Sequence, residues 1–185
     1  MRRYAVLIAV AASLGCGSSN SVNGTIQGQT LSAQDALLLT NNTTVGGTTV
    51  YGLGVSIMNI SNACSTAQAD ISSNKDPANA ASLTIGIGST SPIAAGTFNI
   101  TSASSPAADA IFVKTDSSCH STIDGGAAQA TSGTVTLSSV SASSASGTFD
   151  LTFGSDHVTG SFSASSCTLT FPDGGTDGGG PTCNG

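Results

Sequence analysis

The sequence has no tryptophan, no glutamate and very few cationic residues. Its 185 residues contain four Lys and Arg together against ten acidic residues, all of them Asp, so the formal net charge is −6 at pH 7. Nucleic-acid binding depends on cationic contacts to phosphates, so we expect no nucleic-acid partner. The same shortage argues against binding to an anionic membrane surface through a basic patch.

The N-terminus has the layout of an export signal. Arg2 and Arg3 precede a mainly apolar run of 11 residues from Tyr4 to Leu14. A permanent membrane helix needs about 20 residues, so this run is too short for one and fits a cleaved signal better. We predict a signal peptide over residues 1–15. Its removal takes away both Arg residues, which changes the formal charge from −6 to −8.

The end of this signal indicates lipid attachment. Leu14, Gly15 and Cys16 resemble the lipobox of bacterial lipoproteins, in which a peptidase cuts before the Cys and the Cys carries the lipid. That family usually has Leu three positions before the Cys, where this chain has Ser13. The resemblance implies lipidation at Cys16 and a membrane contact through covalent lipid. Gly17, in place of the Asp that retains lipoproteins at the inner membrane, favours the outer membrane.

The cysteine count agrees with lipidation. If lipid consumes Cys16, four cysteines remain as disulfide candidates: Cys64, Cys119, Cys167 and Cys183. Four cysteines can pair in an oxidising compartment with three connectivities. Of these we predict Cys167 with Cys183, closing the tail onto the last strand, and Cys64 with Cys119. The alternative, a plain secreted protein cut after Ala11, would leave Cys16 unmatched.

Residues 147–163 carry the clearest structural pattern, that of a β-hairpin. Phe149, Leu151 and Phe153 alternate with polar residues, as in a strand with one buried face. Turn residues follow at 154–157, and the alternation then resumes. This hairpin should supply much of the core.

Similar but shorter patterns predict strands elsewhere. They lie at 22–28, 36–39, 51–57, 83–87, 98–100, 110–113 and 134–137. The small residues Gly52 and Gly54 on the outer face of one strand would let another layer approach closely. Residues 41–48 have loop composition, whereas 61–71 follow a helical period with Ser61 or Asn62 as the N-cap.

These elements predict an all-β fold. We expect an antiparallel β-sandwich or flattened barrel of about eight strands with at most one short helix. The predicted organisation is a signal peptide at 1–15, a lipidated Cys and tether at 16–21, a β-sandwich domain at 22–171 and a Gly/Asp-rich disordered tail at 172–185.

Candidate catalytic and metal-binding residues are sparse. His157 lies in the predicted turn and His120 follows Cys119, but no Gly-x-Ser-x-Gly motif accompanies either histidine. Cys64, Cys119 and His120 lack the paired spacing of zinc ligands, and disulfides are the commoner fate of cysteines in an exported protein. Asp173 and Asp177 fit a solvated linker better than a calcium site. We predict no catalytic residue, no metal and no cofactor.

One surface pattern suggests binding. Thr134, Thr136, Thr148 and Thr152 could form a polar row on the outer face of adjacent strands. Such a row could bind carbohydrate or another ordered polar surface, although it lacks the exposed aromatics that usually stack on sugars. The alternative is solvent-facing Thr with good β-propensity.

The combination of the lipobox-like start, the segment Gly-Thr-Val-Thr-Leu-Ser-Ser-Val at 133–140, the hairpin at 146–162 and Cys167 resembles a group of small, uncharacterised lipoproteins abundant in myxobacteria-like soil bacteria. The similarity covers roughly residues 22–167. It implies an envelope location and a β-rich fold, and it transfers no functional residues.

The sequence therefore predicts a lipid-anchored protein of the cell envelope that is not an enzyme. Its role would be structural or adhesive, with an envelope protein or polysaccharide as partner. The alternatives are a secreted hydrolase or hydrolase inhibitor, and a carbohydrate-binding module. An enzyme should show a pocket with convergent titratable groups, whereas an envelope module should show only shallow surfaces.

Overall fold

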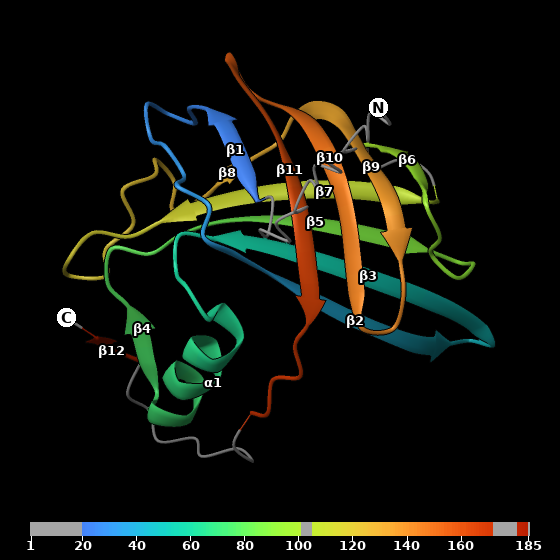
Figure 1. Cartoon of the computed structure of the whole chain (residues 1–185), viewed down its shortest axis with the longest axis horizontal. Coiled ribbons are helices and arrows are strands. Elements are labelled where there is room, and N and C mark those ends of the chain that lie inside the picture. Colours follow the sequence, from blue (N-terminus) through green and yellow to red (C-terminus); the bar gives the residue numbers. More distant parts are fainter. Residues whose placement is uncertain (1–19, 101–104, 172–180, 185) are drawn as a thin grey trace, which may run out of the picture.

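The computed structural model describes residues 20–100, 105–171 and 181–184, and this part of the chain is mostly β (Figure 1). The predicted signal at 1–15, the lipidation site Cys16 and nearly all of the tether lie outside the described residues, as does 172–180 of the tail. The elements are β1 (Ser21–Gly24), β2 (Asp35–Val45), β3 (Thr48–Met58), α1 (Ala63–Ser73), β4 (Lys75–Pro77), β5 (Ala81–Ser89), β6 (Gly96–Asn99), β7 (Ala107–Lys114), β8 (Ala128–Gln129), β9 (Ser132–Val140), β10 (Ser144–Phe153), β11 (Asp156–Ser166) and β12 (Thr182–Asn184).

Ten of these strands form one sheet of mixed direction. Its order is β6-β9-β10-β11-β2-β3-β5-β7-β8, with β1 paired to β11. The expected β-rich fold with one short helix is confirmed. The expected purely antiparallel pairing is wrong, because β11 meets β2 in parallel and β12 meets β4 in parallel. The described chain has twelve strands and not about eight, since pieces as short as β4, β8 and β12 show no readable period.

The predicted hairpin is confirmed as β10 and β11, with Gly154 at its turn (φ 63°). Across this hairpin Phe149 faces Gly160, and Gly147 faces Phe162. A Cβ on either glycine would collide with the opposite Phe ring and with a backbone carbonyl of the neighbouring strand. These two glycines therefore make room for the rings, which cover the exposed backbone in return.

Residues 41–48, which the composition assigned to a loop, are instead the end of a second hairpin, β2 and β3. Gly46 (φ 57°) and Gly47 (φ 82°) form its turn. Positive φ at both central residues gives the twist that joins antiparallel strands tightly. The polar residues before the turn are exposed on both faces, so no buried face leaves an alternating pattern in the sequence.

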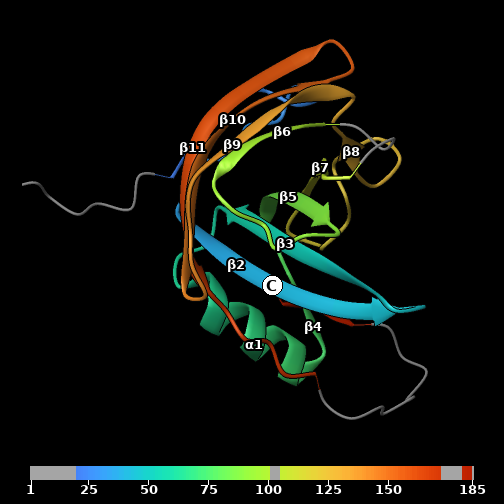
Figure 2. The ribbon, with the colours of Figure 1, turned by 90° about the vertical axis from the view of Figure 1, so that its right-hand side faces the viewer.

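The main hydrophobic core lies inside the curved sheet. Strands β3, β5 and β7 lie on one side of this core and β9, β10 and β11 on the other (Figure 2), and both groups contribute buried residues to it. The largest fully buried side chains are Phe112, Phe162, Ile26, Leu38, Ile57, Leu83, Ile85, Leu137, Leu151, Val55, Val135 and Val158. The outward faces of these two groups of strands therefore point in opposite directions.

The predicted helix is confirmed as α1, and Asn62, one of the two predicted N-cap residues, is its N-cap by position, but the side-chain bond of the cap comes from another residue. Asn62 precedes the helix with a left-handed backbone (φ 53°) and makes no side-chain cap. Asp35, at the start of β2, supplies it: its Oδ2 accepts a hydrogen bond from the Ala63 N–H at 2.8 Å, while its Oδ1 accepts from the Ala36 N–H at 2.8 Å. Asn74 (φ 51°) ends the helix.

All four candidate cysteines form disulfides, but the predicted pairing is wrong. Cys64 pairs with Cys167 and Cys119 pairs with Cys183. The parallel contact of β11 with β2 explains the first pair, because it carries Cys167 to the Leu38 carbonyl (2.9 Å) beside the start of α1. In the second pair, β12 lies beside β4 next to α1 (Figure 1), where the composition had predicted a disordered tail.

Candidate functional site

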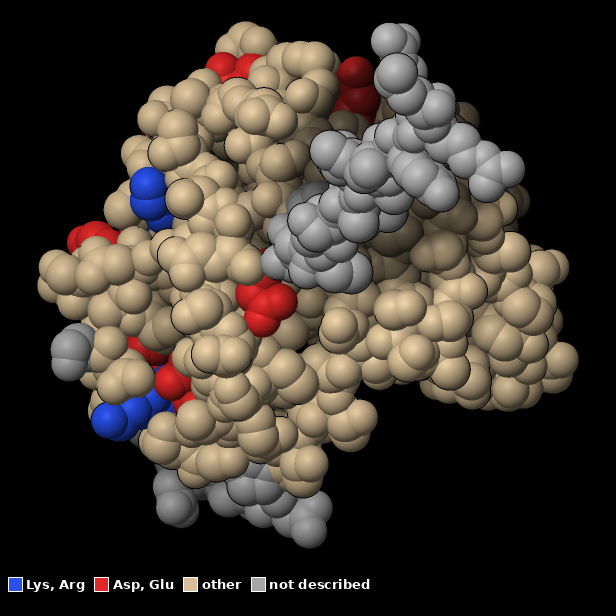
Figure 3. All heavy atoms as spheres, in the orientation of Figure 1, with Lys and Arg blue, Asp and Glu red and all other residues tan. Residues whose placement is uncertain are grey.

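The four predicted threonines share the outward face of β9 and β10. Thr136 and Thr148 are direct cross-strand partners, and Thr134 and Thr152 lie on the same side. The row continues on neighbouring strands, where Thr97 faces Thr136 with hydroxyl oxygens 3.0 Å apart. These two hydroxyls bond each other, which leaves fewer groups for a ligand. On the side drawn in Figure 3, charged side chains are few and scattered.

The two histidines occupy separate parts of the chain. His157, predicted as a turn residue, lies in β11, and its Nε2 is 2.7 Å from Asp150 Oδ1. The two side chains are 58% and 62% exposed, and among the described residues the His157 ring bonds Asp150 alone. A catalytic triad also needs a nucleophile hydrogen-bonded to the same imidazole ring, so this pair is an exposed hydrogen-bonded contact.

His120 belongs to the loop that carries Cys119. The Asp116 carboxylate accepts hydrogen bonds from the Ser118 N–H (2.8 Å) and the His120 N–H (3.0 Å). These bonds, the Ser118 bond foremost, hold the pKa of Asp116 below its ordinary value of 3.8. The histidine contributes a smaller attraction in the same direction. The loop is thus a structural support for the disulfide.

The described residues contain no candidate metal site. No group of three His, Cys, Asp or Glu residues gathers there in a way that could hold a metal ion. Cys64 and Cys119, which with His120 might have suggested zinc, belong to two different disulfides. Asp173 and Asp177 lie outside the described residues.

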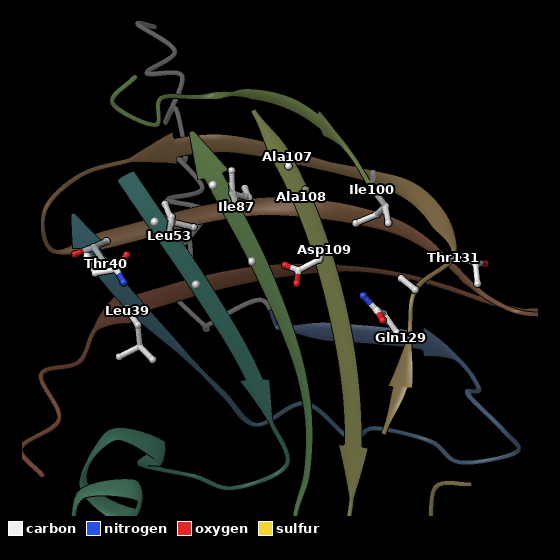
Figure 4. Close-up of a pocket in the computed structure, with 16 residues that line it drawn as sticks. Leu39, Thr40, Leu53, Ile87, Ile100, Ala107, Ala108, Asp109, Gln129 and Thr131 are labelled. Carbon is white, nitrogen blue, oxygen red and sulfur yellow. The ribbon is translucent and has the colours of Figure 1, made fainter. Parts of the chain in front are cut away.

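A groove of about 890 Å³ crosses the surface of β2, β3, β5, β7 and β8 (Figure 4). Two rows of cross-strand partners form its floor, with glycines at the two central positions of each: Leu39, Gly54, Gly86 and Asp109 in the first row, and Asn41, Gly52, Gly88 and Ala107 in the second. Between these glycines, Leu53 and Ile87 are buried in the core. Because side chains alternate along a strand, these two residues present peptide backbone to the groove.

Polar side chains line the groove. Asn41 lies on β2, Asp109 on β7 and Gln129 on β8, and none of the three side chains hydrogen-bonds to another described residue. In Figure 4 the Asp109 carboxylate extends from β7 toward β5, and the Gln129 amide points toward β7. Leu39, 38% exposed, adds an apolar side chain at the β2 end. The groove therefore offers both hydrogen-bond donors and acceptors beside one apolar contact.

Two of these polar side chains lie directly over glycines. A Cβ on Gly52 would collide with Asn41 Oδ1, and a Cβ on Gly86 would collide with Asp109 Oδ1. In contrast, a Cβ on Gly88 would meet nothing within 4 Å. The glycines thus keep the floor low enough for two polar side chains to rest on it, with open space beside them.

Sequence reasoning missed this site. It expected the small outer residues Gly52 and Gly54 to admit another layer of the fold, and no described layer covers them. A second Gly-x-Gly pair, Gly86 and Gly88, was the available signal, because equal spacing in two strands allows the glycines to align. Asp109 gave no signal, since its place beside Gly86 depends on the register of β5 with β7.

Fold and site together define a small, mostly β domain with two disulfides and an open surface groove. Disulfides form and persist in oxidising compartments, so they indicate a location outside the cytoplasm. In the described part of the chain, no helix is both long and apolar enough to cross a membrane. Comparison with family models, curated proteins and solved structures found no match to this chain.

Proposed function

We propose that this chain is an exported, lipid-anchored protein of the bacterial cell envelope that acts by binding and not by catalysis. The observation that carries the proposal is the use of the cysteines. The chain has five, and the four in the folded domain pair with one another. Cys16 is left without a cysteine partner within the chain, directly after an apolar signal, which supports its role as the lipidated residue. The proposed domain is sandwich-like, and the strands on both sides of its core support that description.

The composition of the groove supports binding. Of the described side chains that line it, Asp109 is the one ionisable group. Hydrolysis of a glycosidic bond requires two carboxyl groups, and a nucleophilic triad requires a histidine beside a nucleophile. A wall of amides, one carboxylate and exposed backbone can hold a ligand but lacks the second proton-transfer group.

The proposed anchor would also orient the groove. Four peptide links join Cys16 to Asn20, so the anchor lies within about 14 Å of that residue. Asn20 Oδ1 accepts a hydrogen bond from the Ser163 N–H at 2.8 Å, which places it beside β11. The groove lies on the outward face of β3 and β5, across the core from β11 (Figure 2). The membrane would then lie on the β11 side, with the groove turned away from it.

The intact mass of the mature chain, extracted from its native membrane, tests the proposal. We expect a chain that starts at Cys16 and carries acyl groups, with four thiols that react with an alkylating reagent only after reduction. The matched control is Cys16→Ser, which should keep its signal and carry no lipid while both disulfides still form. A wild-type mass that begins after Ala11 and lacks lipid would refute the anchor.

A further inference from the structure

We propose that the groove over Gly54, Gly86, Gly52 and Gly88 binds a neutral, β-linked glycan chain. This inference deepens the proposed binding role, and it does not depend on the lipid anchor. The first argument is shape. The groove crosses five adjacent strands, which gives it a length of about 19 Å at the usual strand spacing. A β-1,4-linked glycan is an extended, flat ribbon, which suits a long and shallow floor, whereas an α-1,4-linked glucan coils.

The second argument is hydrogen bonding. Asn41, Asp109 and Gln129 have unpaired side-chain groups along the groove, and the backbone beside the glycines is open between them. Sugar hydroxyls both donate and accept hydrogen bonds, so they match a wall that mixes an acceptor-only carboxylate with two amides. The carboxylate and amide oxygens would contact the glycan at separate sugar units and so fix its position in the groove. Leu39 would contact the C–H face of one sugar ring.

The third argument is charge. Among the described residues that line the groove none is cationic, and Asp109 gives it one negative charge in an already acidic protein. Anionic polymers, including nucleic acids and acidic glycans, would meet repulsion with no compensating Lys or Arg. A neutral glycan has no such cost. A ligand held by hydrogen bonds without aromatic stacking should bind weakly, and several sugar units in a row would be needed for a measurable affinity.

Isothermal titration calorimetry of the full mature chain in detergent tests the inference, with cellohexaose and chitohexaose as probes and maltohexaose as the α-linked control. We expect at least one of the two β-linked probes to bind and maltohexaose not to bind. Failure of both β-linked probes, or equal binding of maltohexaose, would overturn the inference. Because this assay does not depend on lipidation, its failure is distinct from failure of the anchor.

Variants locate the ligand. Gly88→Val fills open space on the floor without touching the fold, so we expect an unchanged thermal midpoint and binding at least tenfold weaker. The matched control is Gly96→Val in β6, where a Cβ also meets nothing within 4 Å; Gly96 is not among the residues that line the groove, so binding should not change. Asp109→Ala, at an exposed position of the groove, should also weaken glycan binding at least tenfold. This variant tests the assignment to the groove if Gly88→Val does not fold.

Other occupants of the groove would give different results. Unchanged glycan affinity in both Gly88→Val and Asp109→Ala would overturn the assignment to this groove. Binding of hexalysine in place of the glycans would identify a cationic partner, and a concentration-dependent dimer that Gly88→Val abolishes would identify a second copy of the chain. Either result would also reject the glycan.

Discussion

Cys119 has a left-handed backbone (φ 60°), and the loop that holds it there depends on one carboxylate. Asp116 bonds two amides with its side chain, and its own backbone N–H donates to the His120 carbonyl at 2.9 Å. The carbonyl of Asp116 accepts from the Asn79 N–H at 2.9 Å, which ties the loop to the segment before β5. One aspartate thus positions Cys119, whose disulfide with Cys183 holds the C-terminal strand β12 in place.

The lowered pKa of Asp116 predicts a pH dependence for this loop. The ionised carboxylate is the form that accepts both amides, so its stabilising effect is complete above the ordinary pKa of 3.8 and is lost as the pH falls through the lower folded value. In an NMR titration, the amide shifts of Ser118 and His120 should change with a midpoint below 3.8. Asp116→Asn should abolish this transition, and a wild-type midpoint at or above 3.8 would contradict the prediction.

At the scale of elements, α1 shows how a helix can be capped by a distant strand. Its first turn contains no acidic residue, and Asn62 makes no side-chain bond there. Asp35 lies 28 positions earlier in the chain, yet it accepts the Ala63 N–H. The cap therefore also fixes the helix against β2, where Leu37, Ala63 and Cys167 form a small second core.

Substitution of this cap should destabilise the protein measurably. Asp35→Ala leaves the Ala63 and Ala36 amides without their acceptor, and we expect a loss of about 0.5–2 kcal/mol in the free energy of unfolding, measured with urea. Asp35→Asn keeps an acceptor oxygen and should lose less. Adding Asn62→Asp to the Asp35→Ala variant should not restore the lost stability, because the cap comes from β2 and not from the residue before the helix. Recovery of stability in that double variant would contradict the prediction.

At the scale of the whole molecule, the two disulfides have unequal roles. Cys64–Cys167 closes a separation of 103 residues, and Cys167 is buried in the second core beside Leu37. Cys119–Cys183 closes 64 residues at the surface and retains β12, whose three residues are all exposed. The first disulfide therefore joins the helix, β2 and the chain after β11, whereas the second holds the C-terminus in place.

Removal of each disulfide should reveal this difference. The double variant Cys64→Ala/Cys167→Ala should lose about 2–5 kcal/mol of stability, because the unfolded chain gains a long open loop and the second core loses packing. Cys119→Ala/Cys183→Ala should lose less and should expose residues near β12 to hydrogen exchange. Equal losses in urea unfolding would contradict the unequal roles.

Local alternation predicted much of the fold because a strand with one buried face leaves a period of two in the sequence. That pattern was enough for the hairpin of β10 and β11 and for β3 and β5, whereas a helical period predicted α1. It failed at residues 41–48, because strands exposed on both faces carry no such period. It also failed for β12, which has three exposed residues and depends on a disulfide and on β4 for its place.

By itself the sequence determined the acidic charge, the β-rich class and the four cysteines that pair, and the export signal stays a prediction. Only the tertiary structure decided which cysteines pair and where a ligand could bind. Both follow from contacts between segments far apart in the chain: the parallel contact of β11 with β2 delivers Cys167 to α1, and the register of β3, β5 and β7 aligns four glycines beside Asp109. Such contacts depend on strand order and register, which local composition does not encode.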